Sequence, residues 1–156
     1  MAILLDTTVL SNFARVKLEY ILQRIWGDQA CVAIEVIEEY QAGVKVARLP
    51  SFTWAAVRVL KPSPEEKAFE QTMPQLLGRG ERTSLAIAFN RRAAIATDDA
   101  LARKVARNLG ISITGTIGIL QRAVQREMLA DSQAQRALDE MIAAGYYSPV
   151  SKLDLD

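Results

Sequence analysis

Acidic residues at the ends of apolar runs are the part of this chain with the clearest chemical meaning. Asp6 follows the apolar residues 2–5, and Asp98 and Asp99 follow the run 93–97. In a parallel sheet covered by helices, strands are short apolar runs, and ligand sites form just beyond their carboxyl ends. The chain has no His and one Cys, which excludes His-rich zinc sites and Ser-His-Asp or Cys-His catalysis. Carboxylates that bind a hard divalent cation are the chemistry that remains.

Glu39 is a further candidate, in a helix expected to begin at about Glu35. At about 100° per residue, the apolar side chains of this helix define one buried face. They are Val36, Ile37, Tyr40 and Val44. Glu39 lies at the edge of that face, where a metal-site carboxylate belongs, whereas Glu35 and Glu38 are expected to point into solvent.

Glu81 follows Gly80 and shares the inward stripe of its expected helix with Leu85 and Ala88. An acid in the first turn of a helix also has a purely structural explanation. The helix dipole favours a negative charge there by about 0.3–1 kcal/mol. Glu81 is therefore a candidate site residue only if other acidic side chains lie close to it.

Asp98 and Asp99 lie between an expected strand and the next helix, so one of them could be the N-cap and the other a ligand. Two adjacent acids cannot both stay ionised in a crowded cleft without raised pKa values or a cation between them. Basic residues outnumber acids over residues 79–107, so positive charge surrounds these acids in the sequence. The basic side chains downstream of the pair could equally form the solvated face of that helix.

The elements that must position these acids alternate between strand and helix. Apolar runs predict strands at 2–5, 31–34, 57–60, 93–96 and 111–114. Helical periodicity predicts helices at about 16–27, 116–129 and 132–144, with others from about 35, from about 81 and after 99. The alternation is typical of an α/β fold.

Residues 63–66, Ser-Pro-Glu-Glu, predict a helix start with particular force. A Ser at the N-cap, a Pro at the first helical position and a Glu three residues after the cap together form a capping box. Pro74 is expected to end or bend this helix, and residues 78–80 to turn before the next one. Residues 146–156 have no clear pattern and are expected to be a terminal segment of uncertain order.

Length and composition indicate one domain over residues 1–156. With 156 residues, 50% of them hydrophobic, the chain can bury one full core. Its formal net charge of +1 neither demands nor forbids a nucleic-acid partner. The single cysteine, Cys31, cannot form an internal disulfide. With no signal-peptide pattern and no apolar run near the roughly 18 residues of a membrane span, we expect a cytoplasmic protein.

The order and spacing of these motifs resemble those of the PIN-domain nucleases, in particular their small toxin-like, VapC-like branch. The resemblance implies a three-layer α/β/α sandwich with a central parallel sheet and a helical C-terminal part. It also implies an acidic pocket that holds Mg²⁺ or Mn²⁺. The motifs that carry it are residues 3–10, 36–40, 80–86, 96–103, 109–111 and 115–120.

Carried across to this sequence, the resemblance implies a metal-dependent endoribonuclease. The metal-site carboxylates would be Asp6, Glu39, Glu81 and Asp99, with Asp98 as an alternative or additional member. Thr7 and Thr97 would be supporting polar residues. The basic residues that could hold the RNA backbone are Arg79, Arg82, Arg103 and Lys104.

Many small PIN proteins are toxins of toxin–antitoxin pairs, which implies RNA as the substrate and a cognate antitoxin as a partner. Homodimers are common among them. Apolar helical surface near Trp26 or Trp54 could form such an interface, although aromatic residues at these spacings are more often part of a core.

Two other functions fit parts of the sequence. In a catalytically inactive module of the same fold, which would bind RNA or a protein partner, acids of the site should have been lost, but all the expected acids are present. In a haloacid-dehalogenase-like phosphatase, an acid/base Asp follows two residues after the first Asp. Thr8 stands at that position, and Glu39 and Glu81 would have no role.

Overall fold

A five-stranded parallel sheet lies at the centre of the computed structural model, which describes residues 1–55 and 57–156. Its strands lie in the order β3-β2-β1-β4-β5, so the carboxyl ends of all five meet at one edge. This confirms the α/β class and the five expected strands. Their bounds are β1 Ile3–Leu5, β2 Ala30–Ala33, β3 Arg58–Leu60, β4 Ala94–Ala96 and β5 Ile113–Thr114.

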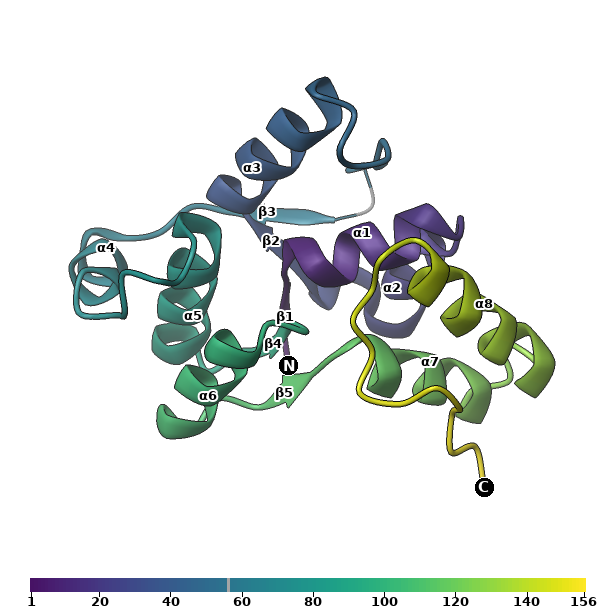
Figure 1. The fold of residues 1–156 in the computed structure, drawn as a ribbon. Coiled ribbons are helices and arrows are strands. Elements are labelled where there is room, and N and C mark those ends of the chain that lie inside the picture. Colours follow the sequence, from purple (N-terminus) through teal and green to yellow (C-terminus); the bar gives the residue numbers. More distant parts are fainter. Residues whose placement is uncertain (56) are drawn as a thin grey trace.

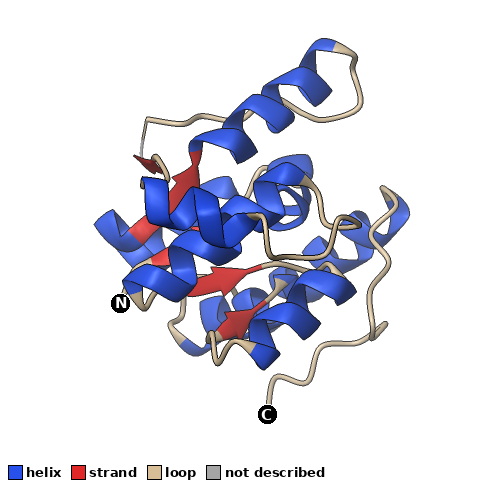
Figure 2. Ribbon diagram, turned by 90° about the vertical axis from the view of Figure 1, so that its left-hand side faces the viewer, coloured by secondary structure: helices blue, strands red, loops and turns tan. Residues whose placement is uncertain are grey.

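Helices cover the sheet in two layers, which gives the expected α/β/α sandwich. In Figure 1, α4, α5 and α6 lie on one side of the sheet, and α1, α2, α7 and α8 lie on the other. Figure 2 shows the strands enclosed between these helices. The helices are α1 Thr7–Arg15, α2 Glu19–Trp26, α3 Ile34–Lys45, α4 Pro64–Glu70, α5 Arg79–Arg91, α6 Ala100–Asn108, α7 Thr116–Gln125 and α8 Asp131–Ala143, with a 3-10 turn at Gly27–Gln29.

The central strand β1 brings Asp6 to the middle of this edge. Leu4 and Leu5 are fully buried, and Leu4 stands opposite Cys31 of β2 and Ile95 of β4. Strands buried on both faces are apolar throughout, which is why short apolar runs predict β1 and β2. The residue that follows β1 therefore lies between the ends of β2 and β4.

The helix predicted over about 16–27 begins later than expected. A separate helix before it was not predicted. α1 begins immediately after Asp6, and α2 begins only at Glu19. The two are separated at Lys17, whose φ of 59° is left-handed. α1 was missed because its buried side includes the polar residues Ser11 and Asn12, which interrupt the apolar stripe on which the prediction depended.

The capping box at α4 is confirmed. Ser63 Oγ accepts the Glu66 N–H at 3.2 Å, and Glu66 Oε2 accepts the Ser63 N–H at 2.7 Å. α4 ends at Glu70, four residues before Pro74, and α5 begins at Arg79 rather than at Glu81.

The C-terminal segment after α8 is packed against the domain, which corrects the expectation of uncertain order. The Leu153 N–H donates to Gln135 Oε1 at 2.9 Å, and Gln121 Nε2 donates to the Asp154 carbonyl at 3.0 Å. Side-chain amides on α7 and α8 hold this backbone, a kind of contact that leaves no periodic signal in the sequence. Within the described residues, no helix is both long and apolar enough to cross a membrane.

Candidate acidic site

Asp6 is a carboxylate buried at the carboxyl end of the central strand. It is 2% exposed, and its backbone N–H donates to the Ala96 carbonyl at 3.0 Å, which continues the β1–β4 pairing. Burial is the main reason that the pKa of Asp6 rises from 3.8 to about 6, and the charges of Glu39 and Asp99 add to this rise. The surroundings of Asp6 therefore disfavour the ionised form of its carboxyl group.

Thr97 joins two of the candidate acids. Its hydroxyl, which is fully buried, donates to Asp6 Oδ2 at 2.8 Å and accepts the Asp99 N–H at 3.2 Å. Thr97 follows β4, the neighbour of β1, so the parallel pairing of these strands brings the two acids to the same place. The structure thus links Thr97 directly to both carboxylate-bearing residues.

Glu39 reaches the site from α3 by contacting the start of α5. Its Oε1 accepts the Gly80 N–H at 2.8 Å. A Cβ at residue 80 would lie 2.7 Å from Glu39 Oε2 and 2.9 Å from Val36 Cγ2, so only glycine allows this approach. Gly80 therefore lets α3 and α5 meet closely enough to hold Glu39 at the rim of the site.

Glu81 is half-buried in the first turn of α5. Its Oε2 accepts the Gly78 N–H at 2.9 Å, which matches the alternative explanation of Glu81 as a first-turn acid. Burial, followed by the charge of Asp6 and then those of Asp99 and Glu39, raises the pKa of Glu81 from 4.5 to about 7. The four acids are thus close enough for their charges to act on one another.

Asp98 and Asp99 point in different directions. Asp99 is the N-cap of α6, where its Oδ1 accepts the Ala102 N–H at 2.7 Å. Asp98 instead turns toward α7, where its Oδ1 accepts the Thr116 N–H at 2.8 Å and its Oδ2 accepts the Thr116 hydroxyl. Asn12 Nδ2 and the Tyr146 hydroxyl also donate to Asp98, at 3.3 and 3.4 Å. The charges that raise the pKa of Asp6 and Glu81 include Asp99, so Asp99 is the member of the pair that faces the other acids.

A protein-family model described as a PIN domain matches residues 2–154, nearly the whole chain. The chain belongs to the PIN-domain family. No curated protein matches it. PIN domains are generally nucleases, so membership supports a hydrolytic reaction on a nucleic acid, and the acids described above lie where ligand sites form in this class of fold.

The oxygen donors of this PIN domain fit a hard divalent cation. Thr7 Oγ1, next to Asp6, is buried without a hydrogen-bond partner among the described residues. Carboxylate and hydroxyl oxygens are the donors that Mg²⁺ and Mn²⁺ prefer. As placed in the part of the chain that the structure describes, no three acidic side chains form a group that could hold a metal ion. Glu39 and Glu81 each use one carboxylate oxygen for a backbone N–H, that of Gly80 and of Gly78, and keep the second oxygen for a cation.

Glu35 corrects one expectation about α3. It is 6% exposed rather than solvated, and its Oε1 lies 3.9 Å from Arg79 Nη2. The strand β2 ends at Ala33, so the first turn of α3 lies inside the crowded carboxyl edge of the sheet, where a helical wheel does not account for neighbouring elements. Glu38 is exposed, as expected, but Glu39, which was expected at the edge of the buried face, is exposed as well.

Sequence reasoning also missed the polar residues that hold Asp98, namely Thr8, Asn12, Thr116 and Tyr146. Asn12 carried a usable signal, because an amide on the buried side of a helix needs a hydrogen-bond partner. Here Asn12 Nδ2 donates to Thr116 Oγ1 at 3.1 Å as well as to Asp98.

Proposed function

We propose that this PIN domain is a divalent-metal-dependent endoribonuclease acting in the cytoplasm. One observation carries the proposal: Asp6 is buried at the centre of the carboxyl edge, where burial and the charges of Glu39 and Asp99 oppose its ionisation. A bound cation would reverse that opposition. A buried carboxylate with acidic neighbours is destabilising in a protein that binds nothing there.

Asp6, Glu39, Glu81 and Asp99 would hold Mg²⁺ or Mn²⁺, and Asp98 is the additional candidate. Held by these residues, such a cation would supply activation of a water for attack on a phosphodiester and stabilisation of the developing charge on the phosphate. Thr97 keeps Asp6 and Asp99 in register through its two hydrogen bonds. Thr7 supplies a buried hydroxyl beside Asp6 that has no hydrogen-bond partner in the described part of the chain.

Basic side chains around the acids support an RNA substrate, because they can neutralise its phosphates. Arg79 and Lys104 are exposed, and Arg79 is near Glu35. Arg82 Nη1 donates to Gln75 Oε1 at 3.3 Å, and Arg103 Nη1 donates to the Thr97 carbonyl at 2.9 Å. These four residues remain our candidates for contacts to the RNA backbone.

We further propose that the protein is the toxin of a toxin–antitoxin pair, that it works as a homodimer, and that an antitoxin covers the acidic site. The support is the resemblance of its motifs to the small toxin-like members of the family. Trp26 and Trp54, near which we expected apolar helical surface, are both partly buried: Arg122 lies over the Trp26 ring, and Trp54 packs against Tyr40.

The decisive experiment incubates the purified protein with structured and single-stranded RNAs in Mg²⁺ or Mn²⁺, and with EDTA. We expect cleavage that needs the metal and is lost in Asp6→Asn and Asp99→Asn. Asp28→Asn, which changes an exposed acid outside the site, is the matched control and should cleave like the parent. RNA that is bound but never cut, with equal binding by the two site variants, would favour a catalytically inactive binding module instead.

A further inference from the structure

A cavity lies beside the acidic site. Asp98 borders it, on the side of Asp98 that faces away from Asp6, Glu39 and Glu81. Its volume is about 390 Å³, and it is bounded by α6, the start of α7 and the C-terminal segment. Cavities that bind small molecules start at about 300 Å³. The side chains used in the argument are Asp98, Arg103, Arg107, Tyr146 and Tyr147.

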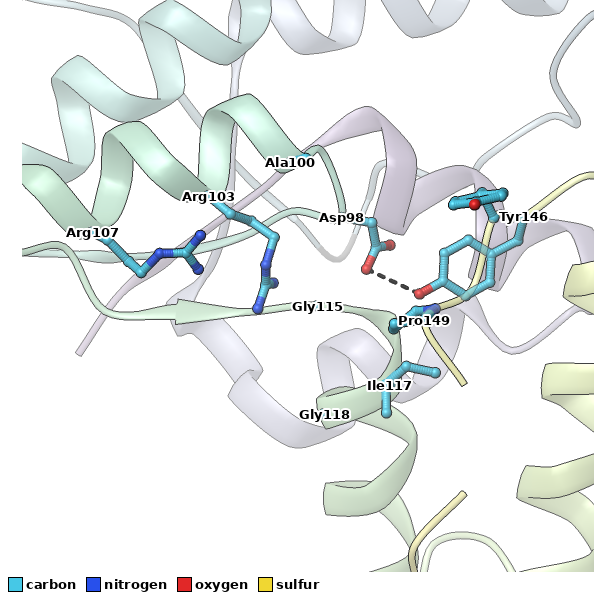
Figure 3. A pocket seen from close by; sticks show the side chains of 10 residues that line it. Asp98, Ala100, Arg103, Arg107, Gly115, Ile117, Gly118, Tyr146 and Pro149 are labelled. Carbon is cyan, nitrogen blue, oxygen red and sulfur yellow. Dashed lines mark hydrogen bonds between the residues drawn. The ribbon is translucent and has the colours of Figure 1, made fainter. Parts of the chain in front are cut away.

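Two arginines supply positive charge along one wall. Arg103 and Arg107 are one helical turn apart on α6, and Figure 3 shows both side chains extending from the same side of the helix. Arg103 is fixed by its bond to the Thr97 carbonyl. Neither arginine has a carboxylate within 4.0 Å in the described part of the chain, so both charges are available to a ligand.

Aromatic rings from the C-terminal segment supply the opposite wall. Tyr146 is anchored, because its hydroxyl donates to Asp98, as Figure 3 shows. Tyr147 lines the same cavity but is 97% exposed. Burying an aromatic ring is favourable, so a ring that the fold itself leaves in water can be covered by a ligand.

The cavity continues toward the acids. A second cavity, of about 430 Å³, shares Asp98, Tyr146 and Tyr147 with the first and is also lined by Asp99 and Arg15. Asp99 borders this second cavity and also faces the other acids, so the two cavities lie in succession next to the acidic site. A chain-like ligand can therefore occupy both at once.

We propose that the cavity between α6 and the C-terminal segment binds one nucleotide of a single-stranded RNA, adjacent to the phosphate that the acidic site cleaves. The base stacks on Tyr147, and the phosphate contacts Arg107 and Arg103. Stacking platforms combined with basic grooves are how proteins bind single strands with little sequence preference. The inference rests on the nuclease function proposed above, but it can be tested without cleavage.

The experiment measures binding of a fluorescently labelled ten-nucleotide uridine RNA by anisotropy, in EDTA, so that no cleavage occurs. We expect Tyr147→Ala to weaken binding at least fivefold, since stacking contributes about 1–3 kcal/mol per base. Tyr147→Phe keeps the ring and should bind like the parent. Arg107→Gln should weaken binding about threefold or more and reduce the salt dependence by about one phosphate contact.

Matched controls are Tyr20→Ala and Arg24→Gln on α2, which remove an exposed ring and an exposed charge elsewhere and should bind within twofold of the parent. Thermal unfolding verifies that each variant is folded. Parent-like binding by both Tyr147→Ala and Arg107→Gln, or no binding of the RNA by the parent, overturns the subsite. If these variants lose binding while the parent never cleaves RNA in Mn²⁺, the subsite stands and the nuclease function fails.

Discussion

At the scale of single residues, the buried acids Asp6 and Glu81 predict how the stability of the protein depends on pH. The pKa values of Asp6 and Glu81 are raised from 3.8 and 4.5 to about 6 and about 7. The folded state therefore binds these protons more tightly than the unfolded chain. Without metal, stability contributed by the protonated forms is lost as the pH rises from about 4 to about 7.

We predict that Mn²⁺ raises the melting temperature clearly at pH 7.5 and much less at pH 5. Asp6→Asn removes the disfavoured charge, so without metal it should stabilise the protein at pH 7.5 by up to about 3 kcal/mol, since the pKa is raised from 3.8 to about 6 and one pKa unit corresponds to about 1.4 kcal/mol. The same variant should lose most of the stabilisation by Mn²⁺. Differential scanning fluorimetry with Asp28→Asn as the control tests this, and an equal metal response in Asp6→Asn would refute it.

The residues at the carboxyl edge were largely predictable, but their directions were not. Apolar runs end where strands end, so Asp6, Asp98 and Asp99 could be placed from the sequence. Which of the adjacent acids faces the site depends on α7, whose Thr116 binds the Asp98 carboxylate from 18 residues away in the chain. No local pattern encodes such a partner.

At the scale of elements, the start of α4 is stabilised from both sides. Glu66 closes the capping box, and it also accepts Arg91 Nε at 2.8 Å and Arg91 Nη2 at 2.9 Å. The Arg91 guanidinium is the main reason that the pKa of Glu66 lies below its usual value. α4 is therefore joined to the far end of α5.

We predict that Glu66→Ala destabilises the protein by about 2–3 kcal/mol, because it removes the cap and a partly buried charge pair together. Its neighbour Glu65 is exposed, and Glu65→Ala should change stability by less than about 0.5 kcal/mol. Urea unfolding at pH 7 gives both values. At a pH below the lowered pKa of Glu66 the difference between the variants should shrink, and a constant difference would contradict the role of the ion pair.

Elements with their own start and stop signals were predicted best. Ser63 and Pro64 predict the first residue of α4 correctly. α1 was not predicted, although Asp6 stands at its N-cap position. The difference is physical: the Ser63 cap bonds locally, but the Asp6 side chain makes no capping bond and instead accepts the Thr97 hydroxyl across the sheet. A side chain that bonds to a residue distant in the chain gives the sequence little indication of where a helix begins.

At the scale of the whole molecule, one hydrophobic core joins the sheet to both helix layers. Leu4 is fully buried in the central strand, so Leu4→Ala should cost about 2–5 kcal/mol. For a chain of this size the melting temperature should fall by roughly 5–15 °C. Far- and near-ultraviolet circular dichroism should report one shared transition, whereas two separate midpoints would contradict a single core. Leu76→Ala, at a side chain 91% exposed, is the control.

The strand order was the least predictable feature, and it decides which acids meet. The alternation of strands and helices indicated a parallel sheet, but the sequence has no marker for the crossover that brings β4 beside β1. The family resemblance implied a central parallel sheet, but no strand order was predicted from it or from the residues. The burial of Glu35 follows from the same packing, because α5 approaches α3 closely at Gly80.

The placement of β1 between β2 and β4 also bears on when the site can exist during synthesis. Asp6 is made before Thr97, the residue 91 positions later whose hydroxyl donates to it. Tyr146, which anchors Asp98, comes 48 residues after that aspartate. The contact between Asp6 and Thr97 therefore cannot form on a nascent chain until Thr97 has left the ribosome, and Tyr146 can hold Asp98 only later still. For the ribonuclease activity that we propose, this order of appearance would spare the message and the ribosome that are still producing the chain.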